Sequence, residues 1–280
     1  MKRVLPLLLA LAGLATSCRS LILEDRMVCP SFLFFDIDNP GPLESYNRVR
    51  IASFSYPETN LTLADTTVLR RIQDKDYYMK VPKADAVQGF GVAGFDGALV
   101  RNGSEVVVEP GENYVPLFRF SYRTPALEEK VLIPVELFKD YCRITLQFTR
   151  SDAFSCAQGL FPFYLVVSGN TVGIDGLSGL PVRGSFRYTP EEEQEGRFQV
   201  LVPRQADRTL QIEIWAKEGQ YIEEGLLDTY NLWQLIQTDD RFSWDARNLP
   251  DLYILLDYTE NKVEITVEPW IKEGSLSYDI

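Results

Sequence analysis

Short runs of alternating apolar and polar residues, separated by turn signals, place the strongest constraint on how this 280-residue chain can fold. The clearest run covers residues 143–149, where Ile144, Leu146 and Phe148 fall on one face. A period of two is typical of a half-buried β-strand. Turn signals such as Asn39-Pro40-Gly41 follow at short spacing along the chain. The pattern predicts an all-β sandwich.

The same reading predicts strands along most of the chain after residue 30. The predicted strands cover residues 31–37, 49–56, 77–81, 87–93, 105–109, 115–122, 163–168, 184–188, 198–202, 210–215, 252–257 and 263–267. One short helix is predicted at residues 226–236. Residues 151–159 are polar and small and separate two blocks of strands, although the break could equally lie several residues to either side. We therefore expect two units, at residues 29–157 and 158–280.

The N-terminus has the organisation of an export signal. Lys2 and Arg3 precede an apolar run at residues 4–14, which is too short to span a bilayer as a helix. Small residues and Cys18 follow, and this resembles a bacterial lipobox with Ala15 where Leu is usual. We predict a signal peptide at residues 1–17, an acyl chain such as palmitate on Cys18, and a tether at residues 18–28. The alternative is an ordinary secretory signal that ends near a cysteine.

The charge and the residue types limit the classes of function. The formal net charge is −12, which repels phosphate backbones and anionic headgroups and argues against nucleic-acid binding. Membrane contact is therefore expected through the lipid on Cys18 alone. The chain has no histidine and no C-x-x-C motif, so neither a metal site nor a cofactor is predicted. With Cys18 acylated, Cys29, Cys142 and Cys156 allow one disulfide, and all three pairings stay open.

Two motifs that resemble ligand sites have plainer interpretations. Residues 89–94 read G-x-G-x-x-G, but Gly97 follows where a dinucleotide site needs a helix, so we interpret them as a glycine-rich strand with a bulge or a close backbone approach. Asp36 and Asp38 begin a calcium-like loop, but Pro40 stands at its fifth position, so we interpret it as a strand that ends in a turn. Among 40 acidic residues no pair is marked out as buried, and we expect no enzymatic activity.

Three segments together resemble a known family. Cys29-Pro30 opens the first predicted strand, residues 176–181 read Gly-Leu-Ser-Gly-Leu-Pro, and residues 248–258 lead to an I-x-V-x-x-W phrase that ends at Trp270. These segments resemble the FimB-like fimbrillin-associated anchor lipoproteins of Bacteroidales, which belong to type V fimbriae. The resemblance implies two tandem transthyretin-like β-sandwich domains. It also implies a place in the cell outer membrane, at the base of a fimbrium whose stalk subunit, a fimbrillin, is the partner.

The resemblance also suggests a mechanism of assembly. Stalk subunits of this kind lose their first strand to a protease, and the C-terminal segment of the next subunit fills the groove by β-augmentation. Because a lipid on Cys18 holds the first strand of this chain, we expect that strand to stay in place and growth to stop here. The tail is then the expected donor, since Leu276, Tyr278 and Ile280 share one face. The alternative is that the tail completes an edge of its own domain or is disordered.

Two other functions stay open. A surface lipoprotein of this class could bind glycans, which needs exposed aromatic side chains on a concave face; Trp215, Trp233, Trp244 and Trp270 are expected mostly in the core. An accessory or tip subunit of the fimbrium would need a cut that releases it from the membrane. Arg19 and Arg26 in the tether are the places where a cut would detach the protein.

Overall fold

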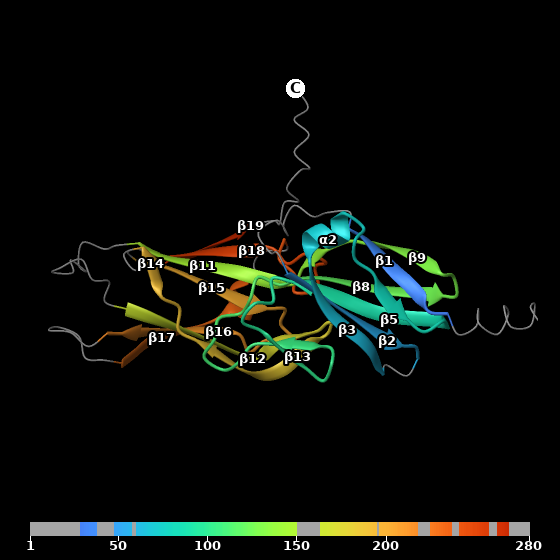
Figure 1. Cartoon of the computed structure of the whole chain (residues 1–280). Helices are drawn as coiled ribbons and strands as arrows, with labels where there is room; N and C mark the ends of the chain where they lie inside the picture. Colours follow the sequence, from blue (N-terminus) through green and yellow to red (C-terminus); the bar gives the residue numbers. More distant parts are fainter. Residues whose placement is uncertain are drawn as a thin grey trace, which may run out of the picture.

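The computed structural model describes residues 29–37, 48–57, 60–149, 163–194, 196–217, 225–236, 241–257 and 262–268. Most of these residues lie in strands, and the described helices are two short ones, α2 (Leu69–Gln73) and α3 (Leu232–Ile236). Four sheets stack in two pairs, which lie end to end in an elongated molecule (Figure 1). The prediction of an all-β sandwich fold is confirmed.

The N-terminal pair consists of sheet A and sheet B. Sheet A has the order β4 (Met79–Val81), β1 (Ser31–Ile37), β9 (Lys130–Val135). Sheet B has the order β10 (Phe138–Lys139), β8 (Phe118–Ala126), β5 (Ala84–Ala93), β2 (Arg48–Ser55), β3 (Leu61–Val68). Phe35 of β1 meets the rings of Phe120 and Tyr122 of β8 at centroid distances of 5.8 and 5.2 Å. Aromatic side chains therefore fill the space between the two sheets.

The C-terminal pair consists of sheet C and sheet D. Sheet C has the order β17 (Gly225–Asn231), β16 (Gln211–Ala216), β12 (Phe163–Asp175), β7 (Glu105–Val107), β6 (Leu99–Arg101), and β13 (Pro181–Tyr188) also pairs with β12. Sheet D has the order β14 (Glu192–Gln194), β15 (Arg197–Pro203), β11 (Tyr141–Thr149), β18 (Asp251–Asp257), β19 (Lys262–Glu268). The ring centres of Phe148 in β11 and Phe163 in β12 lie 6.1 Å apart across the core.

Strands β1 and β11 have equivalent places in their sandwiches. Each has an antiparallel neighbour on one side, β4 or β15, and a parallel neighbour from later in the chain on the other, β9 or β18. By its pairing β11 therefore belongs to the C-terminal sandwich, although the predicted boundary at residue 157 assigned it to the N-terminal unit. The chain passes from one sandwich to the other near Asp140, because β11 pairs with β15, a strand 50 or more residues further along the chain.

The hairpin of β6 and β7 ties the two sandwiches together. It lies in sequence between β5 and β8 of sheet B, yet β7 pairs with β12 of sheet C. Gly173 of β12 permits this pairing, since a Cβ atom there would lie 2.0 Å from the Val106 carbonyl oxygen. The connection between two strands of one sandwich thus completes a sheet of the other.

The helix predicted at residues 226–236 is largely wrong. Residues Gly225–Asn231 form β17, which pairs with β16, and only Leu232–Ile236 are helical. Pairing with β16, the strand that precedes it, has overridden the local helical spacing of apolar residues. The strand alternation at residues 143–149 is confirmed, since Ile144, Leu146 and Phe148 are all buried.

The glycine-rich motif is part of a strand, as predicted. Gly89 and Gly91 lie within β5, next to a register shift between Ala84 and Val87. A Cβ atom on Gly89 would lie 2.1 Å from the Ala52 carbonyl oxygen, and one on Gly91 would lie 2.1 Å from the Phe120 ring. Close approach of neighbouring groups explains these glycines. In the calcium-like segment Asp36 pairs with Lys75, and residues 38–41 lie outside the described residues.

Cys29 and Cys142 are both free thiols, so neither takes part in a disulfide. Cys29 is exposed, whereas Cys142 is fully buried in β11, and burial raises the pKa of its thiol. Within the part of the chain that the structure describes, no group of three or more Cys, Asp or Glu side chains is placed to hold a metal ion. Neither described helix is long and apolar enough to cross a membrane.

Candidate functional site

The predicted lipidation site and the predicted donor face cannot be placed. Cys18, Leu276, Tyr278 and Ile280 all lie outside the described residues. The first strand, on which the predicted mechanism depends, is described in full. It is the central strand of sheet A.

Strand β1 is built into the N-terminal core. Ser31, Leu33 and Phe35 point inward and are at most 1% exposed. The Ser31 hydroxyl contacts the carbonyl oxygens of Ala126 and Glu128, both at 2.6 Å, and so ties the start of the strand to the end of β8. Removal of β1 would leave facing edges on β4 and β9 and an empty apolar groove between them.

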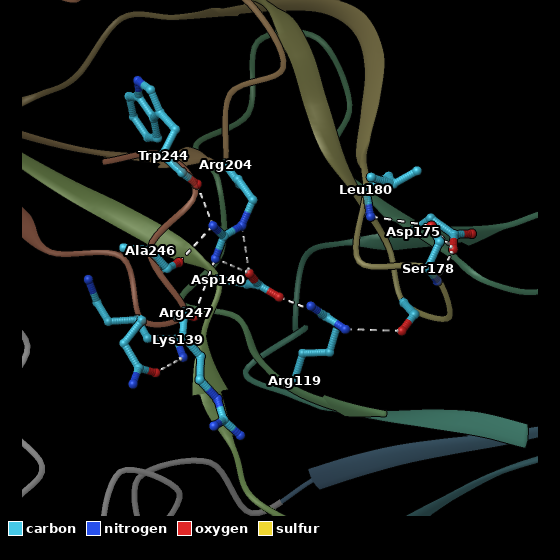
Figure 2. Close-up of polar contacts among 12 residues, drawn as sticks. Arg119, Lys139, Asp140, Asp175, Ser178, Leu180, Arg204, Trp244, Ala246 and Arg247 are labelled. Atoms are coloured by element: carbon cyan, nitrogen blue, oxygen red, sulfur yellow. Dashed lines mark hydrogen bonds and ion pairs between the residues drawn. The ribbon is translucent and has the colours of Figure 1, made fainter. Parts of the chain in front are cut away.

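A buried charged cluster lies where the chain passes from one sandwich to the other (Figure 2). Asp140, between β10 and β11, is fully buried. One carboxylate oxygen accepts from Nε of Arg119 at 2.5 Å, and the other accepts from Nε and Nη2 of Arg204 at 3.1 and 2.9 Å. The cluster thus places one negative charge against two positive charges, and the backbone carbonyls around it complete the hydrogen bonding.

Arg204 fixes the loop at residues 244–247. Its Nη1 donates to the carbonyl oxygens of Trp244 and Ala246, and its Nη2 donates to that of Arg247 at 3.4 Å. Together with the two bonds to Asp140 these contacts use all five N–H groups of the guanidinium. Figure 2 shows the Trp244 carbonyl facing Arg204 while its indole points away from Asp140. Arg204 therefore determines where this loop and its aromatic side chain lie.

Arg119 links the cluster to the turn at residues 176–181. Its guanidinium lies 4.6 Å from the Phe138 ring centre and 3.5 Å from the Gly176 carbonyl oxygen. Asp175 closes this turn through bonds from the backbone and the hydroxyl of Ser178, at 2.6 and 2.7 Å. Burial alone would raise the pKa of Asp175, but hydrogen bonds from Ser104 and Ser178 outweigh it and lower the pKa. One of the family-like segments is thus a rigid turn at the junction.

Lys139, adjacent to Asp140, binds another of the family-like segments. Its Nζ donates to the Leu249 carbonyl oxygen at 2.8 Å and to Asp251 at 2.6 Å. The side chain is 1% exposed, and burial lowers its pKa although Asp251 opposes the shift. Lys139 and Asp140 therefore both anchor the crossover to the C-terminal sandwich.

Two hollows adjoin the loop at residues 244–247 that Arg204 holds. One, of about 590 Å³, lies over Arg119, Phe138, Leu180 and Arg204 at the junction. The other, of about 360 Å³, is lined by Gln205, Arg208, Trp233, Phe242 and Trp244. Trp244 is buried as predicted, whereas Trp215 and Trp233 are half-buried and Trp270 lies outside the described residues.

The sequence interpretation missed both the cluster and the hollows. Asp140 lies 21 residues after Arg119 and 64 residues before Arg204 in the sequence, and no local pattern marks the three as partners. The one available signal is the adjacent pair Lys139-Asp140 between two apolar stretches of sequence, because charged residues are rarely found in a buried place unless they are paired.

Comparisons with solved structures show how widely this fold is shared. The fimbrial anchor protein Mfa2 from Porphyromonas gingivalis superposes with a TM-score of 0.59 at 9% identity, over 87% of this chain and 99% of Mfa2. A candidate adhesin from Bacteroides thetaiotaomicron gives 0.58 at 12% identity, over 86% and 97%. A candidate polysaccharide-binding protein from the same species gives 0.58 at 13% identity, over 88% and 99%.

These similarities extend along nearly the whole of each protein and concern the fold. No protein-family model matches the chain. No curated protein matches it in sequence either.

Proposed function

We propose that this protein is a fimbria-associated lipoprotein of the cell surface, and in particular the anchor that ends a fimbrium at the outer membrane. The observation that carries the proposal is the place of β1, which fills the centre of sheet A with Leu33 and Phe35 fully buried. The fold similarity to a fimbrial anchor protein and the FimB-like segments support it. We propose no enzymatic activity and no cofactor.

The proposed mechanism combines β1 with the lipid. An acyl chain contributes about 0.8 kcal/mol per buried CH₂, so the lipid on Cys18 would hold the protein in the membrane. Since Cys18 precedes β1 in the chain, cutting β1 away would also release the protein from its anchor. The retained strand keeps the N-terminal groove filled, so no further subunit can insert a strand there.

The proposed contact with the stalk is through the tail. Leu276, Tyr278 and Ile280 would enter the open groove of a fimbrillin, where backbone hydrogen bonds give affinity and side-chain pockets give specificity. The anchor would then donate a strand without accepting one. This one-sided role would make it the end of the polymer.

Replacing the lipidated cysteine tests the anchor role. Cys18→Ala should abolish labelling by palmitate and release fimbriae into the medium, because the polymer loses its hold on the membrane. Cys29→Ala is the matched control, since Cys29 is an exposed free thiol and its loss should change neither labelling nor retention. Fimbriae that stay cell-bound in Cys18→Ala would contradict the anchor role and favour an accessory or tip subunit.

Deletion of residues 275–280 tests the tail in the same cells. The shortened protein should stay in the membrane with its N-terminus and β1 intact, while the fimbriae detach from it. Mass spectrometry of the detergent-extracted protein would show whether β1 is still present. Unchanged attachment would rule out the tail as donor without affecting the lipid result.

A further inference from the structure

The outer face of sheet A carries aromatic side chains at the molecular surface. Along β1 the inward residues Leu33 and Phe35 alternate with Phe32 and Phe34, which are half-buried and turn outward. Tyr78, immediately before β4, packs against both outward rings, with centroid distances of 5.1 Å to Phe32 and 5.7 Å to Phe34. Tyr78 is itself 51% exposed, so this cluster of rings presents surface that another body can contact.

Strand β9 extends this surface on the other side of β1. Leu132 stands next to Phe34 in the parallel pairing of the two strands and is 60% exposed. Phe32, Phe34, Tyr78 and Leu132 thus form one apolar patch across three neighbouring strands. Single exposed apolar residues are common on soluble proteins, whereas a contiguous patch marks a place of interaction.

The charges around the apolar patch are balanced, although the chain as a whole is acidic. Lys80 and Lys130 stand opposite the same outward residue, Phe32, on the strands to either side, and both are exposed. Two glutamates at residues 128–129 offset these lysines, and Asp36 at the far end of β1 is neutralised by its ion pair. Lysines beside aromatic rings are typical of a membrane interface, where the stem follows apolar surface and the ammonium group reaches the headgroups.

The apolar patch lies where the proposed tether enters the N-terminal sandwich. Pro30, the last residue before β1, follows Cys18 by twelve residues, so the extended chain between them spans at most about 40 Å. Phe34 lies four residues further on, roughly 13 Å along the strand. A lipid on Cys18 would therefore hold the patch near a bilayer at an effective concentration in the millimolar range. At that concentration even a weak affinity for the membrane is enough.

We propose that the outer face of sheet A lies against the membrane that holds the lipid, with the apolar patch at the level of the headgroups. The inference rests on the proposed lipid anchor and adds an orientation to it. Binding at an interface increases with the apolar area that is buried, and Tyr is favoured there because its ring is apolar and its hydroxyl stays hydrated. The tether brings this face to a bilayer in every copy of the protein, whereas a second copy would have to arrive by diffusion.

Hydroxyl-radical footprinting of the acylated protein in phosphatidylcholine vesicles tests the proposal. Flotation isolates the vesicles, and mass spectrometry measures the oxidation of each residue. Oxidation of the apolar patch should fall several-fold relative to unacylated Cys18→Ala protein without vesicles. Leu226 and Leu227 of β17 are the internal control, since both are 50% exposed and lie at the other end of the molecule from β1 (Figure 1). Their oxidation should be the same in both samples.

The outcomes separate the orientation from the anchor. A protein that floats with the vesicles while its apolar patch is oxidised as fully as in Cys18→Ala would keep the anchor and overturn the orientation. A protein that does not float would contradict the lipid anchor and the orientation together. Protection of the patch in concentrated Cys18→Ala protein without vesicles would assign this face to a second copy and also overturn the proposal.

A paired variant locates the contact. Tyr78→Thr with Leu132→Thr removes the two most exposed members of the apolar patch and keeps residues that suit a strand. The acylated variant should still float, but the rings of Phe32 and Phe34 should lose their protection. The matched control makes the same change at both leucines of residues 226–227 and should keep that protection. Urea midpoints would show that both variants fold. Protection of the two rings that survives in the folded paired variant would overturn the assignment.

Discussion

Asp140 carries one negative charge opposite two guanidinium groups, and this makes it the residue on which the junction most depends. It is fully buried, and its two oxygens serve Arg119 and Arg204 at 2.5–3.1 Å. Asp140→Asn would put an amide in its place and leave two buried cations without a counter-charge. Breaking a buried ion pair in this way costs about 3–5 kcal/mol. Urea unfolding followed by circular dichroism should show a decrease of that size in the free energy of unfolding.

An exposed ion pair provides the comparison for Asp140. Asp96 pairs with Arg48 at 3.0 Å, but their side chains are 70% and 57% exposed. Surface pairs of this kind contribute about 0–1 kcal/mol, so Asp96→Asn should leave the unfolding curve almost unchanged. If the two variants were equally stable, the junction would not depend on the charge of Asp140.

At the scale of elements, the glycines of β5 allow groups of the neighbouring strands β2 and β8 to approach it closely. Gly91→Ala would bring a Cβ atom to 2.1 Å from the Phe120 ring, and that ring is itself fully buried, so β8 or the ring must shift. Overpacking of this kind costs about 1–3 kcal/mol. Gly225→Ala at the start of β17 is the control, since a Cβ atom there would meet nothing within 4 Å. Urea midpoints should fall for Gly91→Ala alone; equal midpoints would show that the space around β5 is not limiting.

Local pattern was enough to predict the central strands and the edge strands β4 and β19, but not the edge strand β17. The alternation at residues 143–149 and the apolar run at residues 31–37 coincide with β11 and β1, because both strands face a core directly. In strand β17 the neighbouring residues Leu226 and Leu227 are both 50% exposed, so buried and exposed residues do not alternate along it. Its backbone pairing with β16 decides its structure instead. The cluster around Asp140 depends on contacts between distant segments, and for that reason no spacing along the chain could predict it.

At the scale of the whole molecule, the buried acids determine how stability depends on pH. Burial raises the pKa values of Tyr77, Tyr114 and Tyr122, and of the Cys142 thiol. When the pKa of a group is higher in the folded than in the unfolded protein, the group stabilises the fold fully at pH values below its unfolded pKa. This contribution to the free energy of unfolding is lost as the pH rises beyond the unfolded pKa. The unfolded values are about 8.5 for Cys and about 10 for Tyr. Stability should therefore fall above about pH 9 and steeply above about pH 10.

Two further features determine the shape of that pH profile. The chain has no histidine, the side chain that ordinarily titrates between about pH 6 and pH 8, so the free energy of unfolding should change little in that range. Burial lowers the pKa of Lys139, and this one group makes stability rise toward about pH 10.5, against the effect of the four acids.

Tyr122→Phe removes one of these acids. The Tyr122 hydroxyl makes only a long bond, of 3.3 Å, to the Ala52 carbonyl oxygen, so the alkaline fall in stability should become shallower by about one proton. Urea midpoints of the wild-type protein and of Tyr122→Phe, measured from about pH 6 to pH 11, would test the flat region near neutral pH and the shallower alkaline fall. Tyrosinate absorbance that rises with a midpoint near pH 10 for every tyrosine while the protein stays folded would contradict the raised pKa values on which the argument depends.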